Sequence, residues 1–549
     1  MRRLALALAL VVVPSGLWGG GGGAAPATDD ATIVHVLNRL TWGPRPGDVE
    51  ALRAKGLERW IDAQLHPERI DDSAVEKRVA ALETHGLSSE ELLKGYELPR
   101  EAKREIQKRR AELGEGASEM DQGRARRELV QKYGLQMQGS PRQVISELQE
   151  SKLLRATLSE RQLDEVLVDF WLNHFNVYAQ KGPVRFLAAD HERAIRAHAW
   201  GRFEDLLVAT AKSPAMLFYL DNWLSADPAA AARRSERVRR FGPRMARRAD
   251  VTPEEMREAL GRRSGLNENY ARELLELHTL GVDGGYTQKD VTEVARAFTG
   301  WTIRGLRQNA PVFAFDARLH DPADKLVLGR TVKAAGEAEG REILHRLATS
   351  PTTARFISWK LARRLVADDP PAALVDRAAA TFERTGGEIR EVVRTIVTAP
   401  EFYAADVRQA KLKTPLEFVV SAVRASGASV ASARELAKRV ADMGMPLYLQ
   451  QPPTGYKDTA EAWVSTSGLV ARLNFALDLS AGRIPGIELP PSAFSPTPGT
   501  SVADSVAARL VPAGLSPSTR ATLEAESKDQ PTPARVAGLV LGSPEFQRR

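Results

Sequence analysis

Residues 267–301 show most clearly which fold class the chain adopts, and they read NENYARELLELHTLGVDGGYTQKDVTEVARAFTGW. Residues with the i, i+3, i+4, i+7 spacing of one helix face occur on both sides of a Gly-rich break: Ala271, Leu274, Leu275 and His278 before it, and Val291, Val294, Ala295 and Phe298 after it. Gly281 and the Gly284-Gly285 pair allow backbone angles that other residues resist. The stretch therefore predicts two helices joined by a tight turn.

The same helical period dominates the rest of the chain, and strand-like alternation of polar and apolar residues is scarce. A clear example of the helical period is ATIVHVLNRLTWG near the N-terminus, whereas LDEVLVDFWLNHFNVY at 163–178 is more apolar and is predicted to be a buried helix. The chain has 549 residues, and a single hydrophobic core stops growing at roughly 250–300 residues. We therefore predict an all-α fold of many helices, packed in two lobes and without a substantial sheet.

Shifts in composition and stretches rich in Gly or Pro divide the chain into six predicted parts. They are a secretory signal peptide (1–27), an N-terminal helical lobe (28–225), an Arg-rich linker or insertion (226–264), a central and C-terminal helical lobe (265–484), a Pro-rich linker (485–503) and C-terminal helices (504–549).

The first residues have the pattern of a cleaved secretory signal. Arg2 and Arg3 precede an apolar run at 4–13, which is too short to span a bilayer, and a Gly-rich stretch then leads to Ala27. The mature chain would begin near Thr28 and work in the periplasm or outside the cell. The rest of the chain has no run of about eighteen consecutive apolar residues, so a transmembrane anchor is not expected. The absence of cysteine excludes disulfides, a thiol nucleophile and thiolate metal ligands.

The positive charge of the chain is concentrated in one segment. Residues 233–248 read RRSERVRRFGPRMARR and carry as much net charge as the whole chain, +7. The patch consists of Arg233, Arg234, Arg237, Arg239, Arg240, Arg244, Arg247 and Arg248. Three interpretations are open: a solvated loop or helix, contact with an anionic envelope component, or contact with a protein partner. Nucleic acid is not expected as a partner of an exported protein.

The hairpin at 267–301 also carries a polar stripe, because Asn269, Arg272, Glu273 and Glu276 share one helix face. In a structural interpretation, Arg272 pairs with Glu276 and the other polar groups bond to the backbone. In a functional interpretation, Glu273 and Glu276 face a cleft and bind a metal or transfer a proton. A buried stripe would favour the functional interpretation, because unpaired buried carboxylates are costly. Thr287 is placed to cap the second helix, with Asp290 at its third position.

Histidines supply the remaining candidate ligands. His278 lies on the apolar face and is expected to be a core residue, whereas His174 lies in FWLNHFNV beside Asn173. A metal-site hypothesis makes His174, Glu273, His320 and Asp321 the ligands of zinc, manganese or calcium. The sequence contains no His-Glu-x-x-His or EF-hand signature to support it. The candidate polar cluster as a whole is Asn173, His174, Asn267, Glu268, Asn269, Arg272, Glu273, Glu276 and Asp290. No residue is singled out as catalytic.

Several motifs occur in an order that resembles a known bacterial family. They are HVLNRLTWGPRPGDVEALRAKGLERWIDAQL, FWLNHFNV, IRAHAWGRFEDLLVATAKSPAMLFYLDN, the hairpin at 267–301, HDPADKLVLG, FISWKLARRLVADDPP, KTPLEFV and SPEF. The chain resembles the family catalogued as domain of unknown function 1800 over nearly its whole mature length. The resemblance implies an exported protein whose gene neighbours a sulfatase-like family, domain of unknown function 1501. It supplies no catalytic residue.

Two functional hypotheses follow. The first is a non-catalytic partner or scaffold that works with a sulfatase-like protein at the cell envelope, with the arginine patch as a contact surface. The second is a metal-assisted hydrolase acting on an extracytoplasmic polymer, with a divalent metal as cofactor. We expect a concave pocket that joins His174, Glu273 and His320 if the second is right. The sequence does not decide whether the protein is an enzyme.

Overall fold

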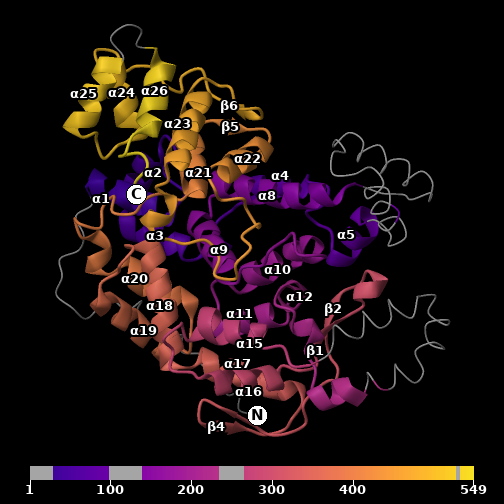
Figure 1. The fold of residues 1–549 in the computed structure, drawn as a ribbon. Coiled ribbons are helices and arrows are strands. Elements are labelled where there is room, and N and C mark those ends of the chain that lie inside the picture. The colour runs from indigo at the N-terminus through magenta and orange to yellow at the C-terminus, as the bar shows by residue number, and fades with distance from the viewer. Residues whose placement is uncertain (1–28, 98–104, 106–138, 234–235, 237–264, 527–531) are drawn as a thin grey trace, which may run out of the picture.

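The computed structural model describes residues 29–97, 105, 139–233, 236, 265–526 and 532–549. The predicted signal peptide and all patch arginines except Arg233 lie outside the described residues. Within the described part of the chain, helices dominate and the only sheets are three two-stranded antiparallel pairs. The prediction of an all-α protein without a substantial sheet is confirmed (Figure 1).

Helices of the first part of the chain pack around α9 and α10. They are α1 (Asp30–Leu40), α2 (Asp48–Lys55), α3 (Leu57–Gln64), α4 (Ser73–Ala80), α5 (Ser89–Tyr96), α8 (Pro141–Leu158), α9 (Gln162–His174), α10 (Val184–His198), α11 (Phe203–Ala211) and α12 (Pro214–Tyr219).

The central part contains the predicted hairpin and two of the small sheets. Its elements are α15 (Asn269–Glu273), the π-helix η3 (Leu274–Thr279), α16 (Gln288–Ala297), β1 (Trp301–Arg304), β2 (Val312–Phe315), β3 (Lys325–Val327), β4 (Arg330–Val332), α17 (Glu337–Ala348), α18 (Pro351–Leu365), α19 (Ala372–Thr385) and α20 (Ile389–Val397). Trp301 pairs with Phe315 in the first sheet, and Lys325 pairs with Val332 in the second.

The last part adds α21 (Pro415–Ser426), β5 (Ser429–Val430), α22 (Arg434–Asp442), α23 (Thr466–Ser480), β6 (Ile487–Glu488), α24 (Val502–Leu510), α25 (Pro517–Glu526) and α26 (Pro533–Gly542). Helices α23 to α26 lie together at one end of the molecule, and α16 lies with the β3–β4 hairpin at the opposite end (Figure 1).

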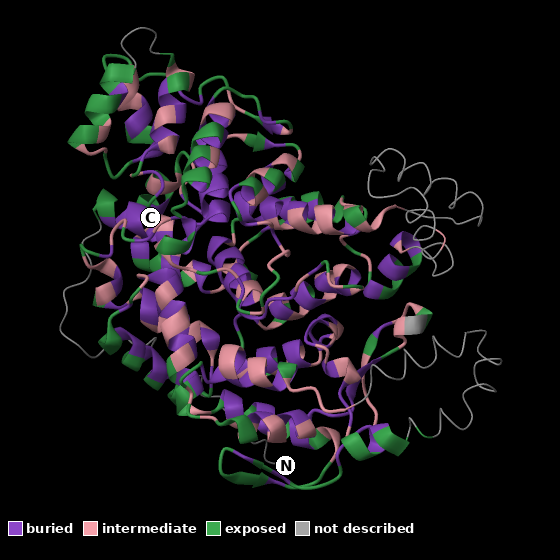
Figure 2. Cartoon of the chain, in the orientation of Figure 1, coloured by how far each residue is buried: buried purple, intermediate pink, exposed green. Residues whose placement is uncertain are grey.

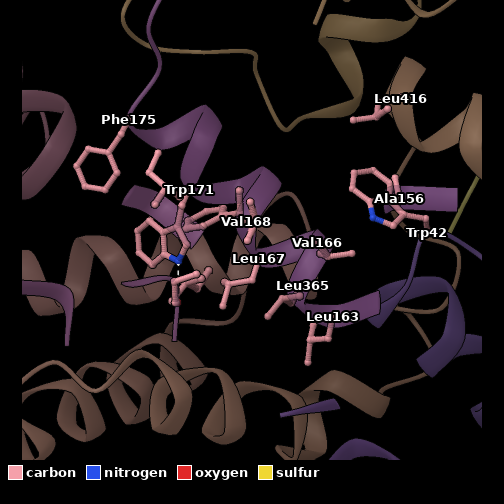
Figure 3. Packing of buried hydrophobic residues seen from close by; sticks show 14 of the residues in the cluster. Trp42, Ala156, Leu163, Val166, Leu167, Val168, Trp171, Phe175, Leu365 and Leu416 are labelled. Atoms are coloured by element: carbon pink, nitrogen blue, oxygen red, sulfur yellow. Dashed lines mark hydrogen bonds between the residues drawn. The ribbon is translucent and has the colours of Figure 1, made fainter. Parts of the chain in front are cut away.

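Helix α9 forms the middle of the core because most of its residues are buried, including a long apolar set. Leu163, Val166, Leu167 and Trp171 are at most 3% exposed. They project from successive turns of α9, with Leu365 of α18 beside them (Figure 3). A helix with apolar side chains on several faces is stable only when neighbours cover those faces. The sequence of α9 therefore fixes its C-terminal end, with His174, deep inside the protein.

One continuous cluster of buried side chains extends from Ile33 to Phe546 and includes α9, α18 and α21. Buried residues line the interfaces between helices, and exposed residues lie on the outward faces (Figure 2). The cluster crosses the predicted boundary between the lobes, and the six predicted parts of the chain stay predictions. Within the described residues, no helix combines the length and the apolar character that crossing a bilayer requires.

The hairpin forms as predicted, with one departure. Thr287 accepts a hydrogen bond from the Asp290 amide, and Asp290 accepts one from the Thr287 amide, so that the two residues form a capping box at the start of α16. The first helix changes from α to π geometry at Leu274, and the Leu280 amide donates five residues back to Leu275. A π turn holds one extra residue, so the regular face expected along 269–278 is shifted in its second half.

Candidate functional site

A cavity of about 220 Å³ opens beside the C-terminal end of α9. Its walls come from α8, α9, α10 and α18, and from the loop at 445–458 that precedes α23. Residues of the candidate cluster lie here, namely Asn173 and His174, together with Lys152, Asp169, Lys360, Arg363, Arg364, Tyr448 and Asp458. Of these residues, only Asn173 and His174 were predicted from the sequence.

His174 is locked in one protonation state by its two neighbours. Its Nε2 lies 3.1 Å from the carbonyl oxygen of His278, which accepts only, so Nε2 carries the hydrogen and donates. This carbonyl belongs to the last turn of the π-helix, where carbonyls lack partners within the helix. The opposite nitrogen, Nδ1, lies 2.8 Å from Nζ of Lys360 and accepts a hydrogen bond from it. Burial, and then the Lys360 charge, lower the pKa of His174 well below its usual value.

The ring of His174 is enclosed by aromatic side chains. Its centroid lies 4.5 Å from that of Phe175, 5.5 Å from Trp171 and 6.2 Å from Phe170. His278 lies 6.1 Å away and is buried, in agreement with its expected place in the core. Removing the imidazole from water in this way favours the neutral ring. His174 therefore acts as a fixed hydrogen-bond acceptor for Lys360.

Lys360 has no ion-pair partner among the residues that the structure describes. Its ammonium group is buried, which lowers its pKa to about 8, with Asp458 opposing the shift and Arg363 adding to it. Within the described part of the chain no carboxylate forms an ion pair with Nζ, whose hydrogen bond goes to the uncharged ring of His174. The Phe356 ring centroid lies 5.6 Å from Nζ on the same helix. Lys360 is thus a half-buried cation that lines a cavity.

Most other charges around the cavity are compensated. Lys152 pairs with Asp169 at 2.5 Å, and Arg364 pairs with Glu417 at 2.7 Å. Lys457 is exposed and lies 3.9 Å from Glu461.

Arg363 is the second cation of the cavity without an ion pair in the described residues. It stacks over the Trp359 ring at 3.9 Å, and its Nε is buried without a hydrogen-bond partner. Lys360 and Arg363 lie one turn apart on α18 and both line the cavity. The cavity therefore has an excess of positive charge.

The loop at 445–458 is clamped over the cavity by the end of α9. The Asn173 side chain donates to the carbonyl of Tyr456 at 2.8 Å and accepts from its amide at 2.7 Å. Asn176 donates to the carbonyls of Gln450 and Pro452 at 3.0 and 2.9 Å. Gly455 is required here, because a Cβ at this position would lie 2.3 Å from the carbonyl oxygen of Asn173. Asn173 thus positions the loop that covers the cavity.

Tyr448 shows that this loop is held in a costly conformation. Its φ is 61°, which is unusual for a bulky residue and costs on the order of 1–3 kcal/mol. Two contacts hold it there: its carbonyl accepts from the Ala179 amide at 3.0 Å, and its hydroxyl donates to Glu192 at 2.6 Å. Such strain concentrates at functional sites and supports the cavity as the candidate site.

The polar stripe of the hairpin does not line this cavity. Most of its side chains form hydrogen bonds or ion pairs with nearby residues. Arg272 reaches Glu268 at 3.5 Å and Gln288 at 2.9 Å, so the expected Arg272–Glu276 pair does not form. Glu276 instead accepts from the Tyr286 hydroxyl at 3.2 Å. The extra residue of the π-helix explains this difference, because it turns Glu276 away from the position expected on a regular helix.

Three further residues of the candidate polar cluster, Asn267, Asn269 and Asp290, form local hydrogen bonds. Asn267 accepts from the Asn269 amide at 2.9 Å, and the Asn269 side chain lies 3.4 Å from the carbonyl of Leu220. Asp290 caps α16 and also accepts from the Leu328 amide at 2.6 Å. Burial, followed by the charge of Glu276, raises the pKa of Glu273 to about 7, while Arg272 opposes the shift.

The four residues of the metal hypothesis do not come together. No group of three or more His, Asp or Glu side chains in the described part of the chain is placed to hold a metal ion. His320 has Nδ1 2.9 Å from the Thr299 carbonyl oxygen and Nε2 3.0 Å from Glu339. Asp321 pairs with Arg296 at 2.7 Å. His320 and Asp321 therefore belong to a buried structural network around Lys325.

Arg233 is the one member of the arginine patch that the structure describes. It is exposed, and its guanidinium lies 3.9 Å from Asp227. The other seven patch arginines lie outside the described residues, and the role of the patch stays a prediction.

The fold and the site define a helical protein with a basic cavity at the end of a buried helix. A model of the family described as "Protein of unknown function (DUF1800)" matches residues 35–548, and the chain belongs to this family. The resemblance seen in the ordered motifs is thereby confirmed. No curated protein and no solved structure matches the chain.

Proposed function

We propose that the protein is an exported binding protein whose cavity holds an anionic group. The observation that carries the proposal is the pair Lys360 and Arg363, which line the same cavity on one helix without a carboxylate partner in the described residues. A charge that is partly removed from water and has no ion-pair partner costs stability. An anion that enters the cavity supplies the missing partner and recovers this cost as binding energy.

Two cationic donors face such an anion. Lys360 offers the hydrogens of Nζ that are not used by His174, and Arg363 offers a planar fork suited to carboxylate, sulfate or phosphate oxygens. The Tyr456 side chain lines the same cavity, although its hydroxyl already donates to the carbonyl of Pro446 at 2.7 Å. The cavity suits a compact anionic group, either a free ion or the end of a larger molecule.

The proposal places the protein in the periplasm or outside the cell, as the N-terminal pattern implies. There the anionic group would belong to an acidic envelope component or to a molecule handled with a sulfatase-like partner. The metal-assisted hydrolase is the weaker alternative, because no observation on the described residues favours it.

Thermal unfolding in the presence of sulfate tests the proposal. Sulfate should raise the melting temperature of the wild-type chain above that in sodium chloride of equal ionic strength. A ligand at one hundred times its Kd stabilises the folded state by about 2.7 kcal/mol. Lys360→Met and Arg363→Met should each remove most of this stabilisation, because each deletes one of the two cations.

Arg355→Met is the matched control, since Arg355 lies on the same helix, is exposed and pairs with Asp376. This variant should keep the full response to sulfate. Phosphate, acetate and a sulfated oligosaccharide, tested in the same way, rank the anionic groups that the cavity accepts. An equal response of the wild type and both cavity variants to every anion would overturn the proposal.

A further inference from the structure

The buried amine of Lys360 is placed for chemistry as well as for binding. We propose that Lys360 forms a covalent imine with the aldehyde or ketone carbonyl of a carboxylate-bearing ligand. The inference rests on the proposed anion site, because Arg363 would hold the carboxylate while Nζ meets the carbonyl carbon. It adds a reactive group to a cavity that otherwise only binds.

The surroundings of Lys360 are those in which a lysine becomes a nucleophile. Its ammonium is removed from water, the Phe356 ring lies against it, and Arg363 is a cationic neighbour. Desolvation and a nearby cation are the two means by which proteins activate lysine. With a pKa of about 8, roughly one tenth of the amine is neutral at pH 7, compared with well under one thousandth for an ordinary lysine.

His174 orients this amine. Because Nε2 donates to the His278 carbonyl, Nδ1 has a lone pair and can only accept from Lys360. One N–H bond of a neutral Lys360 is therefore directed at the ring. The lone pair and the other hydrogen are then left free for the cavity. His174 is thus a positioning residue.

The reaction balances without any further reagent. The neutral amine attacks the carbonyl carbon, the C=O double bond opens to a carbinolamine, and its hydroxyl leaves as water. Starting from the protonated amine, one ammonium and one carbonyl give one iminium ion and one water. The positive charge is kept, so the carboxylate of the ligand remains paired.

Three other lysines near the core do not share these features. Lys152 pairs with Asp169, and Lys325 pairs with Glu339. The pKa of Lys413 is lowered by burial to about 7, but its Nζ lies 3.9 Å from the Phe546 ring centroid. The hollow beside it measures only about 20 Å³, too small for an organic ligand. Lys360 alone among these four combines a lowered pKa with a cavity of useful size.

Reductive trapping of the full chain tests the inference. Glyoxylate, which joins an aldehyde to a carboxylate, is added with sodium cyanoborohydride at pH 8, and the reduced imine remains as a carboxymethyl group on the lysine. Peptide mass spectrometry then gives the rate at each lysine. Lys360 should react at least about tenfold faster than the exposed Lys55, because far more of its amine is neutral.

Two variants separate chemistry from folding. Lys360→Arg keeps the positive charge but cannot form an imine, and should abolish the adduct while retaining stabilisation by sulfate. His174→Leu removes the acceptor and should lower the rate at Lys360 and change its pH profile. His174→Gln, which restores a side-chain oxygen acceptor, should recover part of the rate. Circular dichroism confirms that each variant is folded.

The outcomes distinguish the two proposals. If sulfate stabilises the chain but Lys360 reacts no faster than Lys55, the imine is overturned and the anion site stands. If Lys360 reacts selectively but sulfate neither slows the reaction nor stabilises the chain, the reactive amine stands, and both the anion site and the pairing of the ligand's carboxylate with Arg363 are overturned. Selective reaction that sulfate slows supports both.

Discussion

Two lysines in this protein, Lys325 and Lys360, have opposite surroundings. Lys325, on β3, contacts Glu339 at 2.5 Å, and His320 contacts the same carboxylate at 3.0 Å. Lys360, on α18, contacts a neutral imidazole and faces a cavity. The charges of the network around Lys325 are paired within the protein, whereas the cavity leaves a positive charge that an anion from outside can pair with. The comparison shows how buried charge that maintains structure differs from buried charge that prepares a site.

The same substitution at the two lysines should have effects of different size and sign. Lys325→Met leaves the Glu339 carboxylate buried without its lysine and should lower the free energy of unfolding by about 3–5 kcal/mol. Lys360→Met removes an unpaired cation and should leave stability unchanged or raise it by about 1 kcal/mol. Urea unfolding at pH 7 measures both.

The double variant Lys325→Met/Glu339→Leu provides the control. Replacing both partners of a buried pair by apolar residues is often nearly neutral, so this variant should recover most of the lost stability. Burial acts to raise the pKa of Glu339, but bonds from Lys325, His320 and the Ala335 amide hold it below its usual value. Equal losses for Lys325→Met and Lys360→Met would show that the two sites do not differ as described.

The pH dependence of stability sharpens the comparison further. The pKa of Lys360 is about 8 in the folded chain and 10.5 ordinarily, so the unfolded chain binds the proton more tightly. Between these two values the unfolded state holds more protons, and wild-type stability should rise with pH. The part due to Lys360 is on the order of 3 kcal/mol, present in full above pH 10.5 and absent below pH 8.

Urea unfolding at half-unit steps from pH 7 to 11 measures this effect in the wild type and in Lys360→Met. The difference between the two curves removes contributions from other groups, including Lys413. The Met variant should lack the rise that belongs to Lys360. Parallel curves would mean that the Lys360 ammonium is not desolvated in the folded protein.

The smallest effect is expected on the hairpin stripe. Arg272 and Glu268 are 41% and 33% exposed and 3.5 Å apart, which is an ordinary surface pair. Arg272→Ala should change the free energy of unfolding by less than about 0.5 kcal/mol. The same urea experiment measures it. A loss above about 2 kcal/mol would place Arg272 with the buried networks instead.

Local patterns predicted the helices well, because they report short-range contacts. The capping box of Thr287 and Asp290 and the buried face of α16 follow directly from spacing. The π-helix could not be predicted in this way, since one extra residue in a turn leaves no mark in the composition. The structural interpretation of the stripe paired Arg272 with Glu276 on a regular helix, and the π-helix is the reason why this pair does not form.

Only part of the candidate site could be predicted from the sequence. His174 and Asn173 were noticed because polar residues inside FWLNHFNV are unusual, whereas Lys360 resembles any charged residue of an amphipathic helix. One signal was available: α18 contains four basic residues and no acidic one. Whether a cation is paired depends on contacts between distant segments, and a single sequence does not show them.

The long-range contacts of the two ends of the described chain have a consequence for folding. His35 and Arg39 of α1 bond to the carbonyls of Phe402 and Val407, and Arg549 exchanges backbone hydrogen bonds with Lys411. Pairings this distant in sequence form slowly, because a very long loop must close before they contribute. A chain emerging from a ribosome cannot complete these contacts until Arg549 is free. The architecture therefore delays the packing of α1 and of the segment around Lys411 until residues far along the chain have emerged.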